Sequence, residues 1–209
     1  MIAYAFSFLF PFLLVVAAGQ FILGLCGKTV GGSRTTLILG FFSALILVIP
    51  LGGLPLARWL ISINANFSIP LTALVLSKVW ENAWGTRLLD RKGFLSSCVF
   101  GLLTGLALYP MALGLGGLDP YGLGWSFSLL FVLLMAITII LLFMRNRFGV
   151  VLVACILGYD LQVLESPNLW DYLVDPFFAL ISGIMLGGSL IREMRSKKDD
   201  SHSVSRTSG

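Results

Sequence analysis

The side chains best suited to chemistry lie in the polar segments that follow every second apolar run. They combine carboxylates with carboxamides, phenols and one guanidinium, groups that bind small solutes or act on polar headgroups. The full set is Arg58, Asn64, Asn66, Asp119, Tyr121, Asp160, Glu165, Asn168, Asp171 and Asp175. From this set, with a tyrosine from a neighbouring run, we take a candidate site of Asp160, Tyr109, Arg58, Asp171, Glu165 and Asn168.

Asp160 is the most informative of these residues because an apolar run precedes it. It lies twelve residues after Phe148, which is roughly 18 Å along a helix. A carboxylate at that depth in a membrane is costly and indicates function. Tyr109 reaches a similar depth in the run from Phe94. The alternative is that the helix ends near Gly158 and Asp160 lies in water.

The acids before prolines have a structural explanation. Aspartate is favoured at a helix N-cap and proline at the first helical position. Asp175 and Pro176 therefore predict the start of a helix, and Asp119 and Pro120 predict a turn or short helix. Ser166 in the same way predicts a short helix through Asp171.

Several classes of chemistry are excluded because the only histidine is His202, in a polar C-terminal segment. Bis-histidine haem, histidine-rich metal sites and Ser-His-Asp catalysis all need histidine in the folded body. The chain also has no phosphate-binding loop, dinucleotide fingerprint, HExxH motif or cysteine-pair metal motif. We therefore expect no cofactor, no bound metal and no nucleic-acid partner.

The composition indicates a membrane protein. The 209 residues are 57% hydrophobic and 11% charged, with a mean hydropathy of +0.95. A soluble domain carries roughly 25% charged residues, so this chain cannot cover a water-soluble surface. The cysteines Cys26, Cys98 and Cys155 lie in or beside apolar runs, which argues against a disulfide framework.

The apolar runs predict an all-α polytopic membrane protein with about seven transmembrane helices. One domain, 1–195, contains them, and the polar segment 196–209 is expected to be a disordered cytoplasmic tail. Between the second and third runs, Leu56, Leu60 and Ile63 recur at helical spacing, which predicts a short helix on the membrane surface. The seven expected spans are 3–25, 36–50, 68–80, 94–113, 124–144, 148–164 and 176–191.

The distribution of charge predicts the orientation. With seven spans, 13 of the 14 basic residues fall on one side, and Arg58 is the exception. Basic residues mark the cytoplasmic side, so we expect the N-terminus outside and the C-terminus in the cytoplasm. Removing the weak third span would break this pattern. The basic residues on the cytoplasmic side are Lys28, Arg34, Lys78, Arg87, Arg91, Lys92, Arg145, Arg147, Arg192, Arg195, Lys197, Lys198 and Arg206.

Three local patterns predict contacts. The pairs Gly101/Gly105 and Gly183/Gly187 have the GxxxG spacing of close helix contacts, although glycine-rich chains also contain such pairs by chance. Gln20 suits an interhelical hydrogen bond. Lys78 and Glu81 suit an ion pair.

These patterns favour a non-catalytic transport component or accessory subunit of a bacterial inner membrane, with its polar face outside. The bilayer is its expected partner, and a membrane-protein partner fits as well. One alternative is an enzyme acting on lipid or lipid-linked headgroups, with Asp160 or Asp171 assisted by a divalent cation or Arg58. The other is a structural assembly partner.

Overall fold

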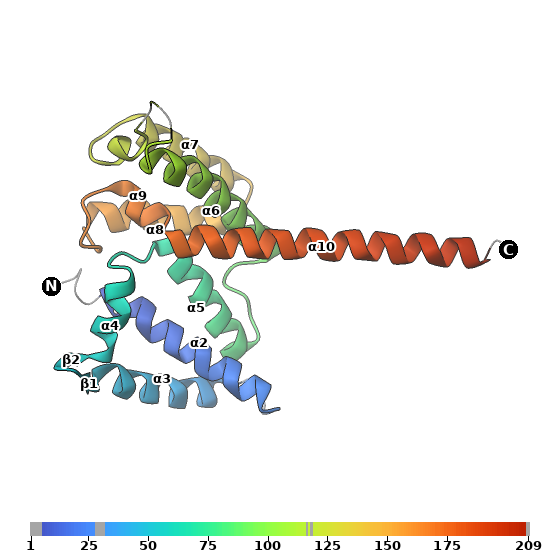
Figure 1. Cartoon of the computed structure of the whole chain (residues 1–209), viewed down its shortest axis with the longest axis horizontal. Helices are drawn as coiled ribbons and strands as arrows, with labels where there is room; N and C mark the ends of the chain where they lie inside the picture. Colours follow the sequence, from blue (N-terminus) through green and yellow to red (C-terminus); the bar gives the residue numbers. More distant parts are fainter. Residues whose placement is uncertain (1–5, 28–31, 116, 118, 208–209) are drawn as a thin grey trace.

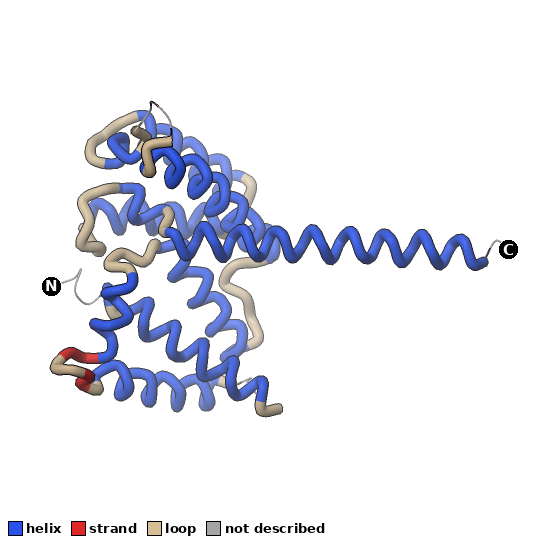
Figure 2. Tube along the Cα trace, viewed as in Figure 1, coloured by secondary structure: helices blue, strands red, loops and turns tan. Residues whose placement is uncertain are grey.

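The computed structural model describes residues 6–27, 32–115, 117 and 119–207, and its long elements are all helices (Figure 2). Each long helix coincides with one of the seven apolar runs, so the all-α class is confirmed. Lys28 lies outside the described residues. The long helices are α2 (Leu9–Leu25), α3 (Ser33–Val48), α5 (Ile69–Trp84), α6 (Arg91–Ala112), α7 (Leu129–Phe143), α8 (Phe148–Asp160) and α10 (Pro176–Thr207).

Short elements join these helices. A hairpin of β1 (Pro50–Leu51) and β2 (Leu54–Pro55) follows α3. Its turn residues Gly52 and Gly53 have φ of 59° and 87°, the left-handed conformation that two-residue hairpin turns need. The remaining short elements are α4 (Leu56–Ile63), η1 (Tyr121–Gly124) and α9 (Leu169–Leu173). Short helices are therefore present where Leu56, Asp119 and Ser166 predict them, but α9 is capped by Asn168 and not by Ser166.

The long helices run between two ends of a bundle (Figure 1). The α9 end (residues 49–68, 113–128 and 161–175) carries the hairpin and the short helices. The basic end carries the loops 85–90 and 144–147. In Figure 1, α2, α3 and α5 lie below α10, whereas α7, α8 and α9 lie above it.

The basic end is held by charged side chains. Glu81 accepts from Lys78 Nζ at 3.4 Å, as predicted, and also from Arg87 Nε at 2.6 Å. Arg147 donates to the carbonyl oxygens of Arg87 at 2.6 Å and Leu88 at 3.2 Å. Exposed ion pairs add little stability, so these contacts mainly order the two loops.

Polar side chains are buried while large apolar side chains face outward. In α3 the buried residues are Thr36, Ser43 and Leu47, whereas Phe41 is 64% exposed. Gln20 is buried and joins three helices. It donates to Thr36 Oγ1 at 3.0 Å and to the Val79 carbonyl at 3.4 Å, and accepts from Asn82 Nδ2 at 2.9 Å. The predicted interhelical role of Gln20 is confirmed.

Helix length does not support seven membrane-spanning helices. Among the described residues, α6, with 22 residues, is the one helix that is long and apolar enough to cross a membrane. Crossing takes about 20 residues, and α8 has only 13. Two of the expected spans, 124–144 and 148–164, are longer than α7 and α8 because these apolar runs include turn residues at the α9 end, such as 161–164 after α8.

The C-terminal segment also differs from expectation. The sequence predicts disorder from Ser196, but the backbone of α10 remains helical to Thr207 and projects beyond the bundle (Figure 1). Extending an existing helix requires no new nucleus. Low hydrophobicity alone therefore does not end the helix here.

Helices α6 and α10 pack closely through the first glycine pair. A Cβ at Gly105 would lie 2.5 Å from Ala179 Cβ, and one at Gly101 would lie 2.5 Å from Ser182 Oγ. Both glycines are buried, so a GxxxG contact is confirmed here. Gly187 of the second pair has open space around it.

We predict that Gly105→Ala lowers the free energy of unfolding by about 1–3 kcal/mol, the usual cost of overpacking. The added methyl group meets Ala179 alone at close range, so Gly105→Ala/Ala179→Gly should recover most of the loss. Unfolding of the purified protein in detergent measures both effects. Gly187→Ala is the control and should match the wild type. An equal loss in the single and double variants would contradict this contact.

Candidate functional site

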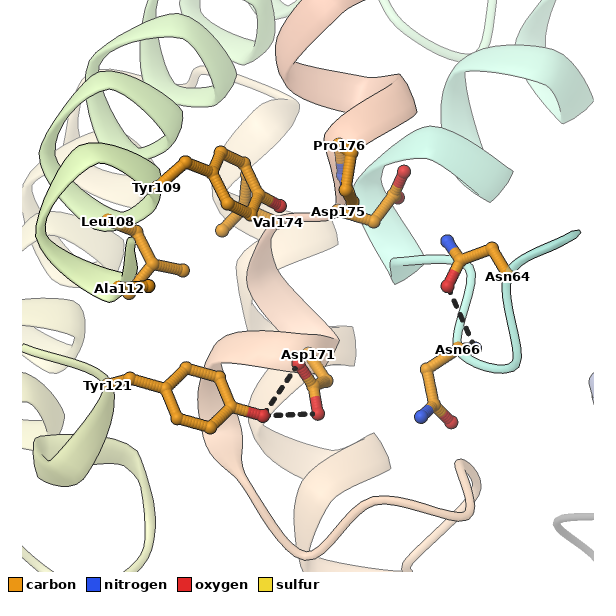
Figure 3. A pocket seen from close by; sticks show the side chains of 10 residues that line it. All are labelled: Asn64, Asn66, Leu108, Tyr109, Ala112, Tyr121, Asp171, Val174, Asp175 and Pro176. Atoms are coloured by element: carbon orange, nitrogen blue, oxygen red, sulfur yellow. Dashed lines mark hydrogen bonds between the residues drawn. The ribbon is translucent and has the colours of Figure 1, made fainter. Parts of the chain in front are cut away.

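A pocket of about 260 Å³ opens at the α9 end, between α6, η1, α9 and the loop after α4. Figure 3 shows two tyrosines on one side, two asparagines on the other and two aspartates between them. Four structurally separate segments therefore bring polar groups to one cavity. Its lining consists of Asn64, Asn66, Leu108, Tyr109, Ala112, Tyr121, Asp171, Val174, Asp175 and Pro176.

Asp175 forms the floor of the pocket and is only 3% exposed. Its Oδ1 accepts from the backbone N–H groups of Phe177 and Phe178 at 2.9 and 3.0 Å, which confirms the predicted N-cap of α10. Its Oδ2 accepts from Ser68 N at 2.9 Å, and Ser68 is the N-cap of α5. Burial raises the pKa of Asp175, while these hydrogen bonds act in the opposite direction.

Asp171 and Tyr121 form the second polar pair. The Tyr121 hydroxyl donates to Asp171 Oδ2 at 3.1 Å and lies 3.3 Å from Oδ1. Burial and the negative charge of Asp171 raise the pKa of Tyr121 to about 12. Tyr121 therefore stays protonated at physiological pH and continues to donate this hydrogen bond.

Asn168 and Trp170 hold η1 in position behind the pocket. Asn168 is fully buried. It accepts from Trp170 N at 2.9 Å as the cap of α9 and donates to the Tyr121 carbonyl at 3.1 Å. Trp170 Nε1 donates to the Pro120 carbonyl at 2.8 Å. These bonds fix the backbone that carries Tyr121.

Asn64 and Asn66 form the opposite wall. Asn64 Oδ1 accepts from Asn66 N at 3.2 Å, and Asn66 Oδ1 accepts from Glu165 N at 3.2 Å. The Asn64 Nδ2 atom is buried and has no hydrogen-bond partner among the described residues. Buried donors are nearly always paired, so this atom is a candidate donor to a ligand.

The structure brings together only part of the candidate site. Tyr109 and Asp171 line the pocket, and Asn168 supports it from behind. Asp160, the last residue of α8, is exposed. Glu165 is also exposed, and its contribution is a backbone N–H group. Arg58 is not part of the lining and instead lies 6.0 Å from the ring centroid of Phe8.

Four polar lining residues are missing from the candidate site. Asn64, Asn66, Tyr121 and Asp175 belong to the wider polar set, but the sequence does not show that they converge. The sequence signal for their convergence is weak because Asp175 and Tyr121 follow short loops whose folding depends on distant partners. The predicted cap at Asp175 was the clearest indication, since a cap can also line a cavity.

The polar groups of the lining limit what the pocket can bind. It offers carboxylate oxygens from two aspartates, two phenols and the amide donor of Asn64, and no lysine or arginine lines it within the part of the chain that the structure describes. No group of three metal-ligating side chains occurs among the described residues. The arrangement suits a small solute rich in hydrogen-bond donors better than an anionic headgroup.

No family model, curated protein or solved structure matches this chain.

We predict that Gly124→Ala separates η1 from α9. An added Cβ at Gly124 would overlap Asn168 Oδ1 and lie 2.9 Å from Trp170 Cδ1. Amide hydrogen exchange in residues 119–128 should rise, because displaced η1 loses its bonds to Asn168 and Trp170. Gly122→Ala is the matched control, since its Cβ would meet only the Asp119 side chain, at 3.3 Å. Equal protection in both variants would contradict the described docking.

Proposed function

We propose that this chain is a seven-pass membrane protein that binds a small solute on its outer face, as a non-catalytic transport component or accessory subunit. The observation that carries the proposal is the convergence of polar groups in the pocket at the α9 end. A bacterial inner membrane is the proposed location. The N-terminus would lie outside and the C-terminus in the cytoplasm.

The exposed apolar surface supports a membrane location. Monomeric soluble proteins rarely expose large contiguous apolar areas. Here α7 exposes apolar side chains around most of its length, while its buried residues include Thr138. The exposed large side chains of α7 are Leu129, Val132, Leu133, Met135, Ile137, Ile139, Ile140, Leu142 and Phe143.

Seven passes are compatible with short helices if the remaining thickness is crossed by protein-covered turns. Non-helical backbone at membrane depth is tolerated where it is buried in protein. The turn after α8 meets this condition in part, because Leu164 is 5% exposed and its N–H lies 3.4 Å from the Tyr172 hydroxyl. A locally thinner bilayer would also reduce the mismatch.

A small uncharged or cationic solute fits the pocket best. Asp171 and Asp175 supply negative charge, and the rings of Tyr109 and Tyr121 favour cations. Asn64 Nδ2 adds a donor for a hydroxyl or carbonyl oxygen. The volume of about 260 Å³ is slightly below that of typical drug-sized sites.

The pocket gives less support to the enzyme alternative than to solute binding. An enzyme acting on phospholipid headgroups would need positive charge for the phosphate, and the pocket lining has none. Asp175 already serves as a cap with three N–H donors. The structural-partner alternative predicts that the pocket binds nothing.

The topology is tested by cysteine labelling in intact cells. In a Cys26→Ser background, Asn66→Cys at the pocket should react with a membrane-impermeant maleimide, since it would lie outside. Thr86→Cys, exposed in the 85–90 loop, should react only after permeabilisation. The native Cys98 and Cys155 are buried and should stay silent. Labelling of Thr86→Cys in intact cells would contradict the orientation.

Solute binding is tested by thermal unfolding of the purified protein with organic ammonium ions, neutral sugars and inorganic phosphate. We expect stabilisation by an ammonium ion or a sugar and none by phosphate, because a ligand at 100 times its Kd adds about 2.7 kcal/mol. Asp171→Asn and Tyr109→Phe should reduce the shift, and Asp160→Asn should not. Stabilisation by phosphate alone, or turnover of a bound solute, would favour the enzyme alternative. No shift with any solute would favour a structural role.

A further inference from the structure

A second cavity lies at the α9 end and, unlike the polar pocket, is lined by apolar side chains. It is a groove of about 470 Å³ between the start of α2 and the end of α3. Its rim residues Leu9 and Val48 are 37% and 66% exposed, so the groove opens to the surroundings. The lining is entirely apolar and consists of Phe8, Leu9, Phe12, Ala44, Leu47, Val48 and Pro55.

Positive charge lies at one end of this groove. The Arg58 guanidinium carbon is 6.0 Å from the ring centroid of Phe8, which lines the groove. Pro55, another lining residue, directly precedes α4, and α4 is anchored by the fully buried Ala57. Arg58 is the only basic residue in the segments that form the α9 end.

We propose that this groove binds one anionic phospholipid, with an acyl chain between α2 and α3 and its phosphate at Arg58. An apolar slot beside a single guanidinium matches an acyl chain joined to a phosphate. Arginine suits phosphate because its planar donors match the phosphate oxygens. Trp59, next to Arg58, is 49% exposed, as expected of a tryptophan at headgroup level.

Charge complementarity favours a lipid over a second protein helix as the occupant. An apolar helix would use the groove alone and not the positive charge beside it. A phospholipid satisfies both features at once. The proposal rests on the proposed membrane location but not on solute binding in the polar pocket.

The test measures lipid retention by the purified protein in detergent, using native mass spectrometry with phosphatidylglycerol and, separately, diacylglycerol. Arg58→Gln should weaken phosphatidylglycerol binding about tenfold, the loss expected for one charge-assisted hydrogen bond. It should leave diacylglycerol binding unchanged, and Arg58→Lys should retain part of the preference. Ala44→Phe should reduce binding of both lipids by filling the groove.

Leu45→Phe is the matched control because Leu45 is exposed on the same helix outside the groove. It should bind both lipids like the wild type. If Ala44→Phe does not fold, Val48→Phe at the rim replaces it. Wild-type lipid binding by either Arg58→Gln or the groove variant would overturn the proposal. A dimer that the groove variant disrupts would identify a second copy as the occupant, which also overturns it.

The membrane location is checked separately by alkaline extraction of cell membranes. Recovery of the chain in the soluble fraction would contradict the membrane location. A chain that stays in the membrane fraction without a preference for phosphatidylglycerol would contradict the lipid site alone.

Discussion

The α9 end depends on the hydrogen bonds that the carboxylate of Asp175 accepts. This carboxylate caps α10 through Phe177 and Phe178 and reaches Ser68, the cap of α5, 107 positions away in the chain. One buried side chain therefore fixes where two long helices begin and closes the floor of the pocket. The same carboxylate faces a cavity lined by Tyr109 and Asp171. One carboxylate therefore caps α10, binds the cap of α5 and lines the pocket, and its three N–H donors account for its burial at 3% exposure.

The sequence predicts the helices well because apolar runs and caps are local signals. Gly101 and Gly105 were also predictable as a contact, but their partner was not, since Ala179 and Ser182 are identified only by tertiary packing. The spans at α7 and α8 were over-estimated for the same local reason. Hydropathy does not show where an apolar run leaves the helix, as it does after Asp160.

The candidate site was predicted only in part because a site depends on convergence between distant segments. The depth assigned to Asp160 rests only on its distance from Phe148 along the helix. That distance does not show which way the side chain faces, and Asp160 is exposed in the structure. Asn64 and Tyr121 carry no distinctive motif. Tyr121 reaches the pocket through the docking of η1 on α9 by Asn168, a contact between residues 47 positions apart, and Asn64 reaches it from the loop after α4. The sequence therefore predicted which residue types could bind a solute, but it did not predict which of these residues line the pocket.

The α9 end contains two cavities of opposite character, the polar pocket and the apolar groove. Phe67 packs against both α2 and α10, stacked on Phe10 at 4.0 Å and lying 5.9 Å from Phe177. On the α10 side the pocket gathers carboxylates without a cation. On the α2 side the groove is apolar, with Arg58 beside it. If both carboxylates and the guanidinium shared one cavity, they would pair and lose their attraction for ligands. Because the carboxylates line one cavity and the guanidinium lies beside the other, the pocket and the groove present opposite charges to their surroundings.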